Sequence, residues 1–487
     1  MKQLNLQLSL LFSFMLCSVS VLAYGEALTI NNYLDMVAKD NSDLKSIQSN
    51  IDAVKGKLAE IERVYEYSFS VGINYSDDES GRPYSQSNRL SDVSNWNYDA
   101  SINKQFETGT QLSLGVNGSY GTYNFVNDAP PYYTISDIAP FVKLQQSLLK
   151  DINGGSTKAS IAKQKASAKS VLYLLRYKKQ KLLFDARIAY WNLSYARTVI
   201  YFKKVSLDRK KRLLDWNEKR YKMDLAEKSD LLQSEAAVKS GELNLKLAYE
   251  DENRANRAFN QFLNIKDEKV KYDVEKFEDK GTSFKVNRTL TKNRTRADVL
   301  AALEDVNTAL YDQEASKKNK GADLVLEGKY SLNGLEQSSG KAFEHVRNGD
   351  RPSYSVGLRY TIPLDFKLRK AIDKGYEAAK ISAQSAAESS VVRENNDWIQ
   401  LLDDWNNAKI RLDLAFEVEK IQKQRYEEDG NLLKRGRTTT YMLLQSEEDL
   451  DSANLNVLRG ILELIQIYEQ AKAFYGGVNE DLEKDIR

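Results

Sequence analysis

Six segments of the chain alternate between apolar and polar residues. From the N-terminus, these segments are 67–75, 98–106, 112–120, 138–148, 324–332 and 354–362. The alternation is strict in the first, third and sixth, where the polar positions are mostly serine, asparagine and glycine. A period of two predicts β-strands with one apolar and one polar face. The chain is therefore expected to contain four strands in its first half and two in its second, with a tight turn at Gly109 between two of them.

These two-faced strands have two explanations. Lengths near ten residues, with one aromatic and aliphatic face and one polar face, are what a membrane β-barrel requires, because lipid lies outside it and water inside. A soluble sandwich with a dry core is the alternative. Tyrosines at the segment ends, among them Tyr67, Tyr75 and Tyr354, favour the barrel because tyrosine gathers at membrane interfaces. The polar segment 333–351 is expected to be a loop.

Two long stretches without proline or glycine, 156–240 and 376–429, predict unbroken helices. A helix over about 156–222 would be roughly 100 Å long at about 1.5 Å per residue, longer than a globular core is deep. Apolar residues in both stretches follow steps of four and three, a heptad seam that predicts packing along neighbouring helices. The seam residues are Leu182, Ala186, Ala189, Leu193, Ala196 and Ile200, and then Leu401, Trp405, Ala408, Leu412 and Ala415. A soluble coiled-coil rod would show the same seam.

The chain also repeats itself. The pentapeptide LLQSE occurs at 231–235 and again at 443–447, an offset of 212. Trp191, followed by asparagine and six positions later by arginine, recurs in the same context as Trp405, an offset of 214. These anchors predict two tandem copies of one helix–strand–helix unit.

The first residues have the pattern of a secretory signal peptide, residues 1–23. An apolar run over 8–22 is broken only by serine and ends at Ala23, which predicts cleavage after that residue. An uncleaved membrane anchor is the alternative, although the run is short for a span. The single cysteine, Cys17, follows the bulky Leu16, where a lipidation site requires a small residue. The mature chain is then expected to contain no cysteine.

The expected organisation follows from these patterns. It consists of the signal peptide at 1–23, a first repeat at 24–264, a linker or equatorial segment at 265–295, a second repeat at 296–476 and a C-terminal tail at 477–487. The first repeat divides into strands at about 66–149, a long helix at about 156–222 and a shorter helix at about 229–263. The second divides into strands at about 322–364, a long helix at about 366–432 and a shorter helix at about 438–475.

Catalytic chemistry is not expected. The only histidine, His345, lies in the polar segment 333–351, and no cysteine remains after cleavage, which argues against a histidine-based triad or a His/Cys metal site. A phosphate-binding glycine loop is also missing from the sequence. We therefore expect no enzyme activity, cofactor or metal. The net charge of +2, from 71 basic and 69 acidic residues, gives no support to a nucleic-acid partner.

Four passages lie where strands meet helices and where helices turn. They are VGLRYTIPL at 356–364, its counterpart VKLQQSLL at 142–149, and the two tip segments MDLAEKSDL at 223–231 and RGRTT at 435–439. Together with the repeat and the order of elements, they make the mature chain resemble the TolC family of outer-membrane efflux proteins over essentially its whole length.

The resemblance implies an α+β membrane protein, a homotrimer whose strands form one outer-membrane β-barrel that is continued by a long periplasmic α-helical barrel. It also implies the exit duct of a tripartite efflux or type I secretion system, which conducts substrates passively to the exterior. The implied partners are further copies of the chain, a periplasmic adaptor (membrane fusion protein), an inner-membrane pump of the RND, ABC or MFS type, and outer-membrane lipid. A periplasmic coiled-coil adaptor or structural protein of the cell envelope is the alternative, although an adaptor would need a lipoyl-like segment and only one helical hairpin.

The resemblance also assigns roles to the two helical tips. The residues expected to contact the adaptor are Met223, Asp224, Leu225 and Ala226 in the first tip and Arg435 and Gly436 in the second. The family usually has glycine where Asp224 stands, so the first tip departs from the family pattern.

The residues expected to form a periplasmic gate are Asp230, Arg437, Thr438 and Thr439. Asp230 matches the family's tip aspartate, which helps to close the entrance, and Arg437 is its expected cationic partner, although the family arginine aligns with Thr438. The alternative is that Asp230 only caps the shorter helix together with Ser229.

The number of strands separates this chain from the family pattern. Relatives commonly contribute four strands per chain, two from each copy, and a trimer then has twelve. The alternation here predicts six per chain and eighteen in a trimer, which would make a wider barrel. The hairpin around Gly109 decides between the two numbers.

Overall fold

The computed structural model of the chain describes residues 27–80, 90–125, 132–266, 272–275, 277, 290, 292 and 295–475. The predicted signal peptide with Cys17, the predicted tail at 477–487 and most of the linker at 265–295 lie outside these residues. The chain divides into two compact units. Unit 1 consists of Met1–Asn50, Leu175–Arg296 and Arg393–Arg487, and unit 2 of Ile51–Leu174 and Ala297–Val392. Each unit therefore contains residues of both predicted repeats.

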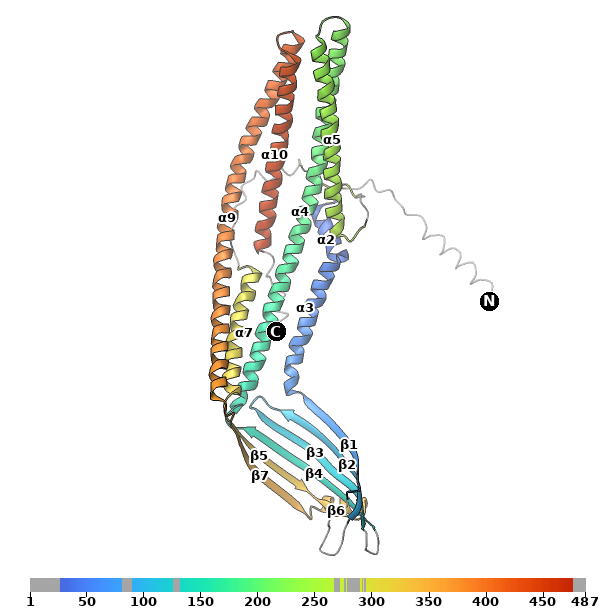
Figure 1. The fold of residues 1–487 in the computed structure, drawn as a ribbon, viewed down its shortest axis with the longest axis vertical. Coiled ribbons are helices and arrows are strands. Elements are labelled where there is room, and N and C mark those ends of the chain that lie inside the picture. The colour runs from blue at the N-terminus through green and yellow to red at the C-terminus, as the bar shows by residue number, and fades with distance from the viewer. Residues whose placement is uncertain are drawn as a thin grey trace, which may run out of the picture. The chain divides into compact units, whose positions relative to one another are not determined.

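Unit 2 contains one antiparallel sheet (Figure 1). Its strands are β1 (Tyr67–Asp78), β2 (Leu90–Gln105), β3 (Thr110–Phe125), β4 (Tyr132–Ser147), β5 (Asp323–Leu332), β6 (Gly334–Glu336) and β7 (Pro352–Thr361). The order is β1-β2-β3-β4-β5-β7, and the short β6 pairs with β4. β2 and β3 pair from a turn at Gly109, whose φ of 78° lies in the left-handed region that glycine adopts readily. The six long strands confirm the number predicted from the alternation.

The structure also extends the predicted elements. β2 begins at Leu90 and β4 at Tyr132, several residues before the alternation starts, because the ladders with β3 continue through these weakly patterned ends. The segment 333–351 was expected to be a loop, and this prediction is wrong. It contains β6 and the helix α8 (Ser339–Asn348), which ends at Gly349 with a φ of 71°.

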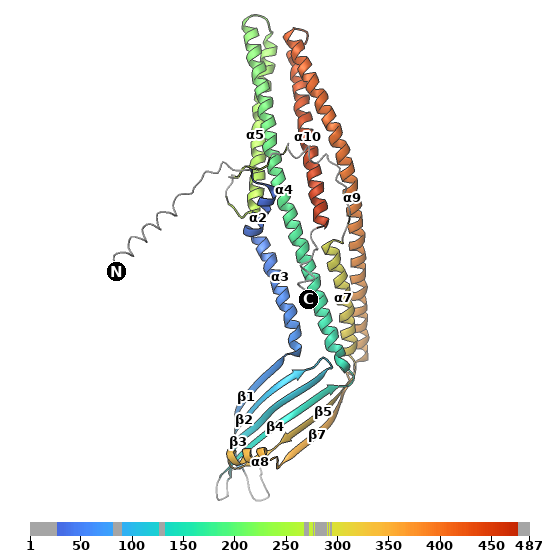
Figure 2. The same ribbon diagram turned by 180° about the vertical axis from the view of Figure 1, so that it is seen from behind.

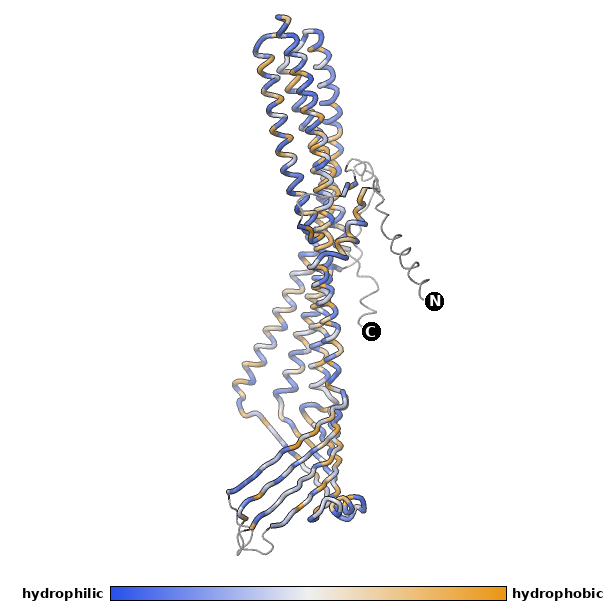
Figure 3. The backbone as a smooth tube through the Cα atoms, turned by 90° about the vertical axis from the view of Figure 1, so that its right-hand side faces the viewer, coloured by the Kyte–Doolittle hydropathy of each residue, from blue (hydrophilic) through white to orange (hydrophobic). Residues whose placement is uncertain are grey.

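The register gives the sheet one apolar and one polar face. Residues directly opposite each other in neighbouring strands point to the same face. On one face the row Val71, Ala100, Val116 and Pro140 crosses β1 to β4, and the row Val142, Tyr330 and Tyr354 crosses β4, β5 and β7. On the other face the row Asn103, Ser113, Lys143, Lys329 and Ser355 crosses β2 to β7. Hydrophobic and hydrophilic colours accordingly alternate along the strands (Figure 3).

The two edges of the sheet are β1 and β7. Among the described residues, β1 pairs only with β2 and β7 only with β5. All ten residues of β7 are exposed. Each edge therefore presents a row of unpaired backbone groups, which can accept another strand.

The helical parts of unit 2 come from α3 (Ser42–Ile61), α4 (Gly155–Lys222), α7 (Ala297–Asn319) and α9 (Phe366–Lys434). Asp151 fixes the start of α4, because its Oδ1 accepts from the backbone N–H groups of Ser156 and Thr157 at 2.8 and 2.9 Å. Lys163 of α4 pairs with Asp312 of α7 at 2.8 Å. The first two contacts hold the start of α4, and the ion pair joins α4 to α7.

Unit 1 is helical and contains α2 (Ile30–Asp40), α5 (Lys228–Phe262), α10 (Thr440–Tyr475) and the adjoining parts of α3, α4 and α9 (Figure 2). The two repeat anchors, Trp191 and Trp405, lie in its core and are each 3% exposed. The ring of Tyr33 stacks on that of Phe259 with centroids 4.2 Å apart. The predicted heptad seam is confirmed by its buried members, which are Ala186, Ala189, Leu193, Ala196, Ile200, Leu401, Trp405, Ala408 and Leu412. No helix in the described part of the chain is both long and apolar enough to cross a membrane.

Candidate functional site at the helical tips

The first tip joins α4 to α5 through residues 223–227. Asp224 has a φ of 57°, in the left-handed region where glycine is preferred and where aspartate is among the better tolerated alternatives. The turn is held by Arg220, whose guanidinium donates to the carbonyl of Leu225 at 2.7 Å. The side chains of Met223 and Leu225 are 68% and 60% exposed. The tip thus keeps a glycine-like turn without glycine and presents two apolar side chains.

The second tip joins α9 to α10 through residues 435–439. Gly436 has a φ of 70°, so this turn uses glycine where the first uses aspartate. Thr439 caps α10, because its Oγ1 accepts from the backbone N–H of Met442 at 3.3 Å. Both tips lie at the same end of unit 1 (Figures 1 and 2).

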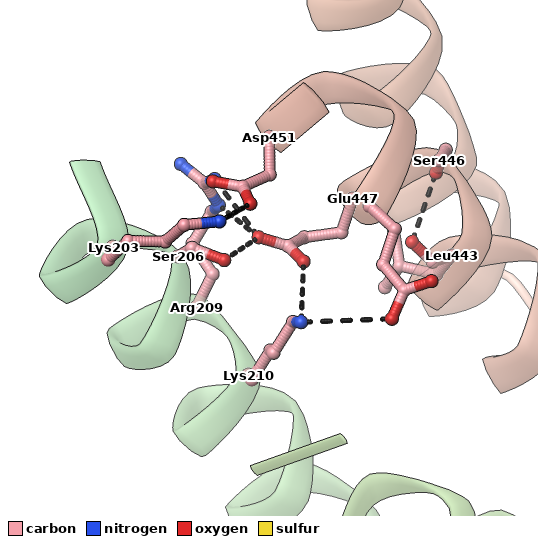
Figure 4. A network of polar contacts seen from close by, with 9 residues as sticks. Lys203, Ser206, Arg209, Lys210, Leu443, Ser446, Glu447 and Asp451 are labelled. Atoms are coloured by element: carbon pink, nitrogen blue, oxygen red, sulfur yellow. Dashed lines mark hydrogen bonds and ion pairs between the residues drawn. The ribbon is translucent and has the colours of Figure 1, made fainter. Parts of the chain in front are cut away.

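Behind the tips, a buried carboxylate joins the two hairpins. Glu447 of α10 is only 3% exposed and points at α4 (Figure 4). Its Oε1 accepts from Ser206 Oγ at 2.6 Å and from Arg209 Nη2 at 3.0 Å, while its Oε2 lies 3.4 Å from Lys210 Nζ. Lys210 itself is 5% exposed. Two cations and a hydroxyl on α4 thus meet one carboxylate on α10.

Further polar contacts extend this link along α4. Lys203 pairs with Asp451 of α10 at 2.6 Å. Nearer the tips, the fully buried Asn217 donates to Ser234 Oγ of α5 at 2.6 Å and to Thr440 Oγ1 of α10 at 3.3 Å. We call the contacts of Lys203, Ser206, Arg209, Lys210 and Asn217 with α5 and α10 the inter-hairpin network.

The inter-hairpin network is incompletely satisfied. Among the described residues, Glu447 Oε2 and Asp451 Oδ1 are buried without a hydrogen-bond partner, although Lys210 lies within ion-pair distance of the former. Nearby, burial raises the pKa of Tyr426, whose ring lies 5.6 Å from the guanidinium of Arg209. A buried polar network with free acceptor sites is stabilising when intact and costly when one partner is removed. Removing any one partner of Glu447 is therefore expected to destabilise the contact between α4 and α10.

Comparison with known proteins shows which fold these hairpins and this sheet compose. The outer-membrane channel OprN is 14% identical, with a TM-score of 0.66 over 92% of this chain and 90% of that chain. The CmeC outer-membrane channel of Campylobacter jejuni is 13% identical, with a TM-score of 0.64 over 94% of this chain and 89% of that one. The outer-membrane protein VceC of Vibrio cholerae is also 13% identical, with a TM-score of 0.64 over 92% and 97%. The chain has the fold of the TolC-family outer-membrane channels.

The similarity is confined to three-dimensional structure. No protein-family model matches the sequence, and no curated protein matches it. The resemblance to the TolC family that the sequence passages indicate is therefore confirmed for the fold, through structures at low sequence identity.

Within the single chain, Asp230 does not meet Arg437, its expected cationic partner in the predicted gate. Among the described residues, no ion pair or hydrogen bond joins the side chains of Asp230 and Arg437. Asp230 lies in the first turn of α5, but the residue at the N-cap is Glu227, which makes no side-chain cap bond. A carboxylate in the first turn still interacts favourably with the helix dipole. A gate at Asp230 therefore remains a hypothesis about contacts between copies of the chain.

The inter-hairpin network is the part of the candidate site that the sequence did not assign. A usable signal was present in the repeated LLQSE, since Ser234 and Ser446 are both fully buried and Glu447 is its last residue in the second copy. Each pentapeptide begins at the fourth residue of its helix, α5 or α10. No group of three or more metal-ligating side chains occurs in the described part of the chain.

Proposed function

We propose that the protein is an outer-membrane channel, the exit duct of a tripartite efflux or type I secretion system. It conducts substrates passively from the periplasm or a pump to the exterior and carries out no catalysis. Its partners are two further copies of the chain, a periplasmic adaptor and an inner-membrane pump of the RND, ABC or MFS type. The observation that carries this proposal is the sheet with one apolar and one polar face.

The apolar face of that sheet is exposed in the single chain. Phe69 and Ile73 of β1 are each 71% exposed, and Val356 of β7 is 76% exposed. Large apolar side chains rarely form contiguous exposed patches in water, whereas a lipid-facing barrel wall requires them. The opposite face carries serine, asparagine and lysine, which suit a water-filled lumen. A soluble sandwich would instead cover the apolar face with a second layer.

The free edges of the sheet support a homotrimer. A lipid-exposed strand edge leaves backbone groups without partners, so spanning sheets must close. In our proposal β7 of one copy pairs with β1 of the next, and three sheets of six long strands close into an eighteen-stranded barrel. Barrels of 16 to 18 strands are wide enough to leave an aqueous channel.

The helices carry apolar stripes that fit the same assembly. Leu243 and Leu247 on α5 are 60% and 48% exposed, and Leu414 and Ile421 on α9 are 56% and 61% exposed. The spacings of four and seven residues within these pairs are typical of a coiled-coil seam. We propose that α5 and α9 of neighbouring copies pack through these stripes and form the periplasmic tunnel.

The tips would then surround the periplasmic entrance. The inter-hairpin network holds α4 to α10 within each copy, while Asp230, Arg437, Thr438 and Thr439 connect neighbouring copies. The adaptor contacts the exposed tip residues, which are Met223, Asp224, Leu225, Ala226, Arg435 and Gly436. In this proposal, opening breaks both the inter-hairpin network within each copy and the weaker contacts between copies, at three symmetric positions.

Fractionation and conductance test the proposal. The mature chain, expected to begin near Tyr24, should sediment with the outer membrane as a trimer that resists mild detergent and should form discrete conductance steps in planar bilayers. Recovery from the soluble or inner-membrane fraction would favour the adaptor alternative. A monomer in all detergents would contradict the channel.

A further inference from the structure

The segment between β5 and β7 is a folded element at the end of the sheet where β5 finishes and β7 begins (Figures 1 and 2). β6 pairs with Ser136–Ile138 of β4, and Ser136 Oγ lies 3.0 Å from Ser339 Oγ of α8. Gly334 packs so closely on the carbonyl of Ala342 that an added Cβ would collide with it. α8 is therefore seated on β6 and β4.

The only histidine of the chain lies at the centre of this element, between two carboxylates. His345 Nε2 is 3.1 Å from Glu336 Oε1 of β6, and His345 Nδ1 is 3.1 Å from Asp350 Oδ2 just after α8. Arg351 also faces Glu336, at 3.4 Å, and donates to the carbonyl of Leu335 at 2.9 Å. The imidazole thus bridges the strand and the end of the helix.

This arrangement requires two donors from the imidazole. An ionised carboxylate only accepts hydrogen bonds, and a neutral imidazole has one N–H and one lone pair. Only the imidazolium donates to both Glu336 and Asp350. In the neutral state one ring nitrogen faces an oxygen of the same acceptor character, and that contact becomes unfavourable.

We propose that His345 is a proton-sensitive clasp that holds α8 on β6 when the ring is charged and loosens it when the ring is neutral. Histidine is the side chain whose charge ordinarily changes between about pH 5 and 8. Arg351 continues to compensate Glu336 after deprotonation, whereas His345 is the only cation within ion-pair distance of Asp350 among the described residues. The other charged residues of α8, which are Lys341, Glu344 and Arg347, are exposed.

The clasp stands on contacts within one chain. Its consequence, an outer mouth of the channel that changes with external pH, rests on the proposed function. Acid outside the cell would hold the element down, and neutral or alkaline conditions would loosen it.

Hydrogen exchange of the intact mature protein in detergent tests the clasp. After correction for intrinsic exchange rates, protection of the α8 amides should fall about three- to tenfold between about pH 6 and pH 8, since one charge-assisted hydrogen bond of a half-exposed group is lost. Amides of the β2–β3 hairpin serve as the internal reference and should not change. Equal protection of α8 at both pH values would overturn the proposal.

Two variants separate the clasp from a general effect of pH. His345→Gln should remove the pH dependence, because its amide keeps the same donors at both pH values. Glu336→Gln should retain high protection at about pH 8, because the glutamine amide can donate to the lone pair of the neutral ring while its oxygen still accepts from Arg351. Unchanged pH dependence in His345→Gln, or loosening of Glu336→Gln like the wild type, would refute the clasp. If the trimer conducts but the protection of the α8 amides does not depend on pH, only the clasp is refuted. If that protection depends on pH but the protein does not conduct, only the channel is refuted.

Discussion

Replacing Glu447 by glutamine removes one charge from the inter-hairpin network while preserving the shape of the side chain. The variant leaves Lys210, 5% exposed, without its buried counter-charge, and weakens the bond from Arg209. Breaking a buried pair from one side costs about 3–5 kcal/mol, and the retained amide oxygen places the change near the lower end. A loss of about 3 kcal/mol per chain shifts the closed-to-open equilibrium of the α4–α10 contact by about a hundredfold.

Single-channel recording in planar bilayers measures this shift. We expect Glu447→Gln to raise the mean conductance or open fraction of trimers that still resist mild detergent. Glu235→Gln is the matched control, because Glu235 is the last residue of the other LLQSE copy and is exposed. An exposed substitution of this kind changes stability by only about 0.5 kcal/mol or less. If both variants conduct like the wild type, the network is a packing contact and does not hold the entrance closed.

Three further predictions address other parts of the molecule. Asp230→Ala combined with Arg437→Ala should raise single-channel conductance, whereas a helix-cap role predicts unchanged conductance and a small loss of thermal stability. Gly334→Ala should lower the protection of the α8 amides from hydrogen exchange, because overpacking costs on the order of 1–3 kcal/mol. Gly340 has open space around it, so Gly340→Ala should leave that protection unchanged. Equal effects of the two variants would contradict the close packing at Gly334. Burial raises the pKa of Tyr190. The contribution of Tyr190 to the free energy of unfolding is therefore fully present below the ordinary tyrosine pKa of about 10 and is lost as the pH rises further. The melting temperature should therefore fall above about pH 10, and it should fall less in Tyr190→Phe. An identical fall in both proteins would show that Tyr190 is not the cause.

The strands could be predicted from sequence because their apolar face is continuous. Where one face must meet lipid or a core, a period of two marks every strand, and this signal included the hairpin around Gly109 that separates six strands from four. The same rule cannot detect β6 or α8. Three residues are too few to show a period, and α8 is set on the sheet by its fit to Gly334 and by the charges around His345.

The candidate site was only partly predictable for a different reason. The resemblance located both tips, and the left-handed φ of Asp224 is the conformation that the expected family glycine would adopt readily. The repeat located LLQSE but could not distinguish Glu235 from Glu447. One is exposed and the other buried because Arg209 and Lys210 of α4 face only the second copy. That difference arises from the packing of the two hairpins against each other, and the sequence repeat carries no information about that packing.

The accessibility of neighbouring residues in a central strand tests the account most directly. Ser113 and Leu114 of β3 point to opposite faces, opposite Lys143 and Val142 of β4. Because the mature chain is expected to contain no cysteine, Ser113→Cys and Leu114→Cys each introduce one unique thiol. In intact outer-membrane vesicles we predict that a charged, membrane-impermeant thiol reagent labels Ser113→Cys through the lumen and leaves Leu114→Cys unlabelled in lipid. Equal labelling of both, or labelling of Leu114→Cys alone, would contradict a barrel whose apolar face meets the membrane and whose polar face lines the channel.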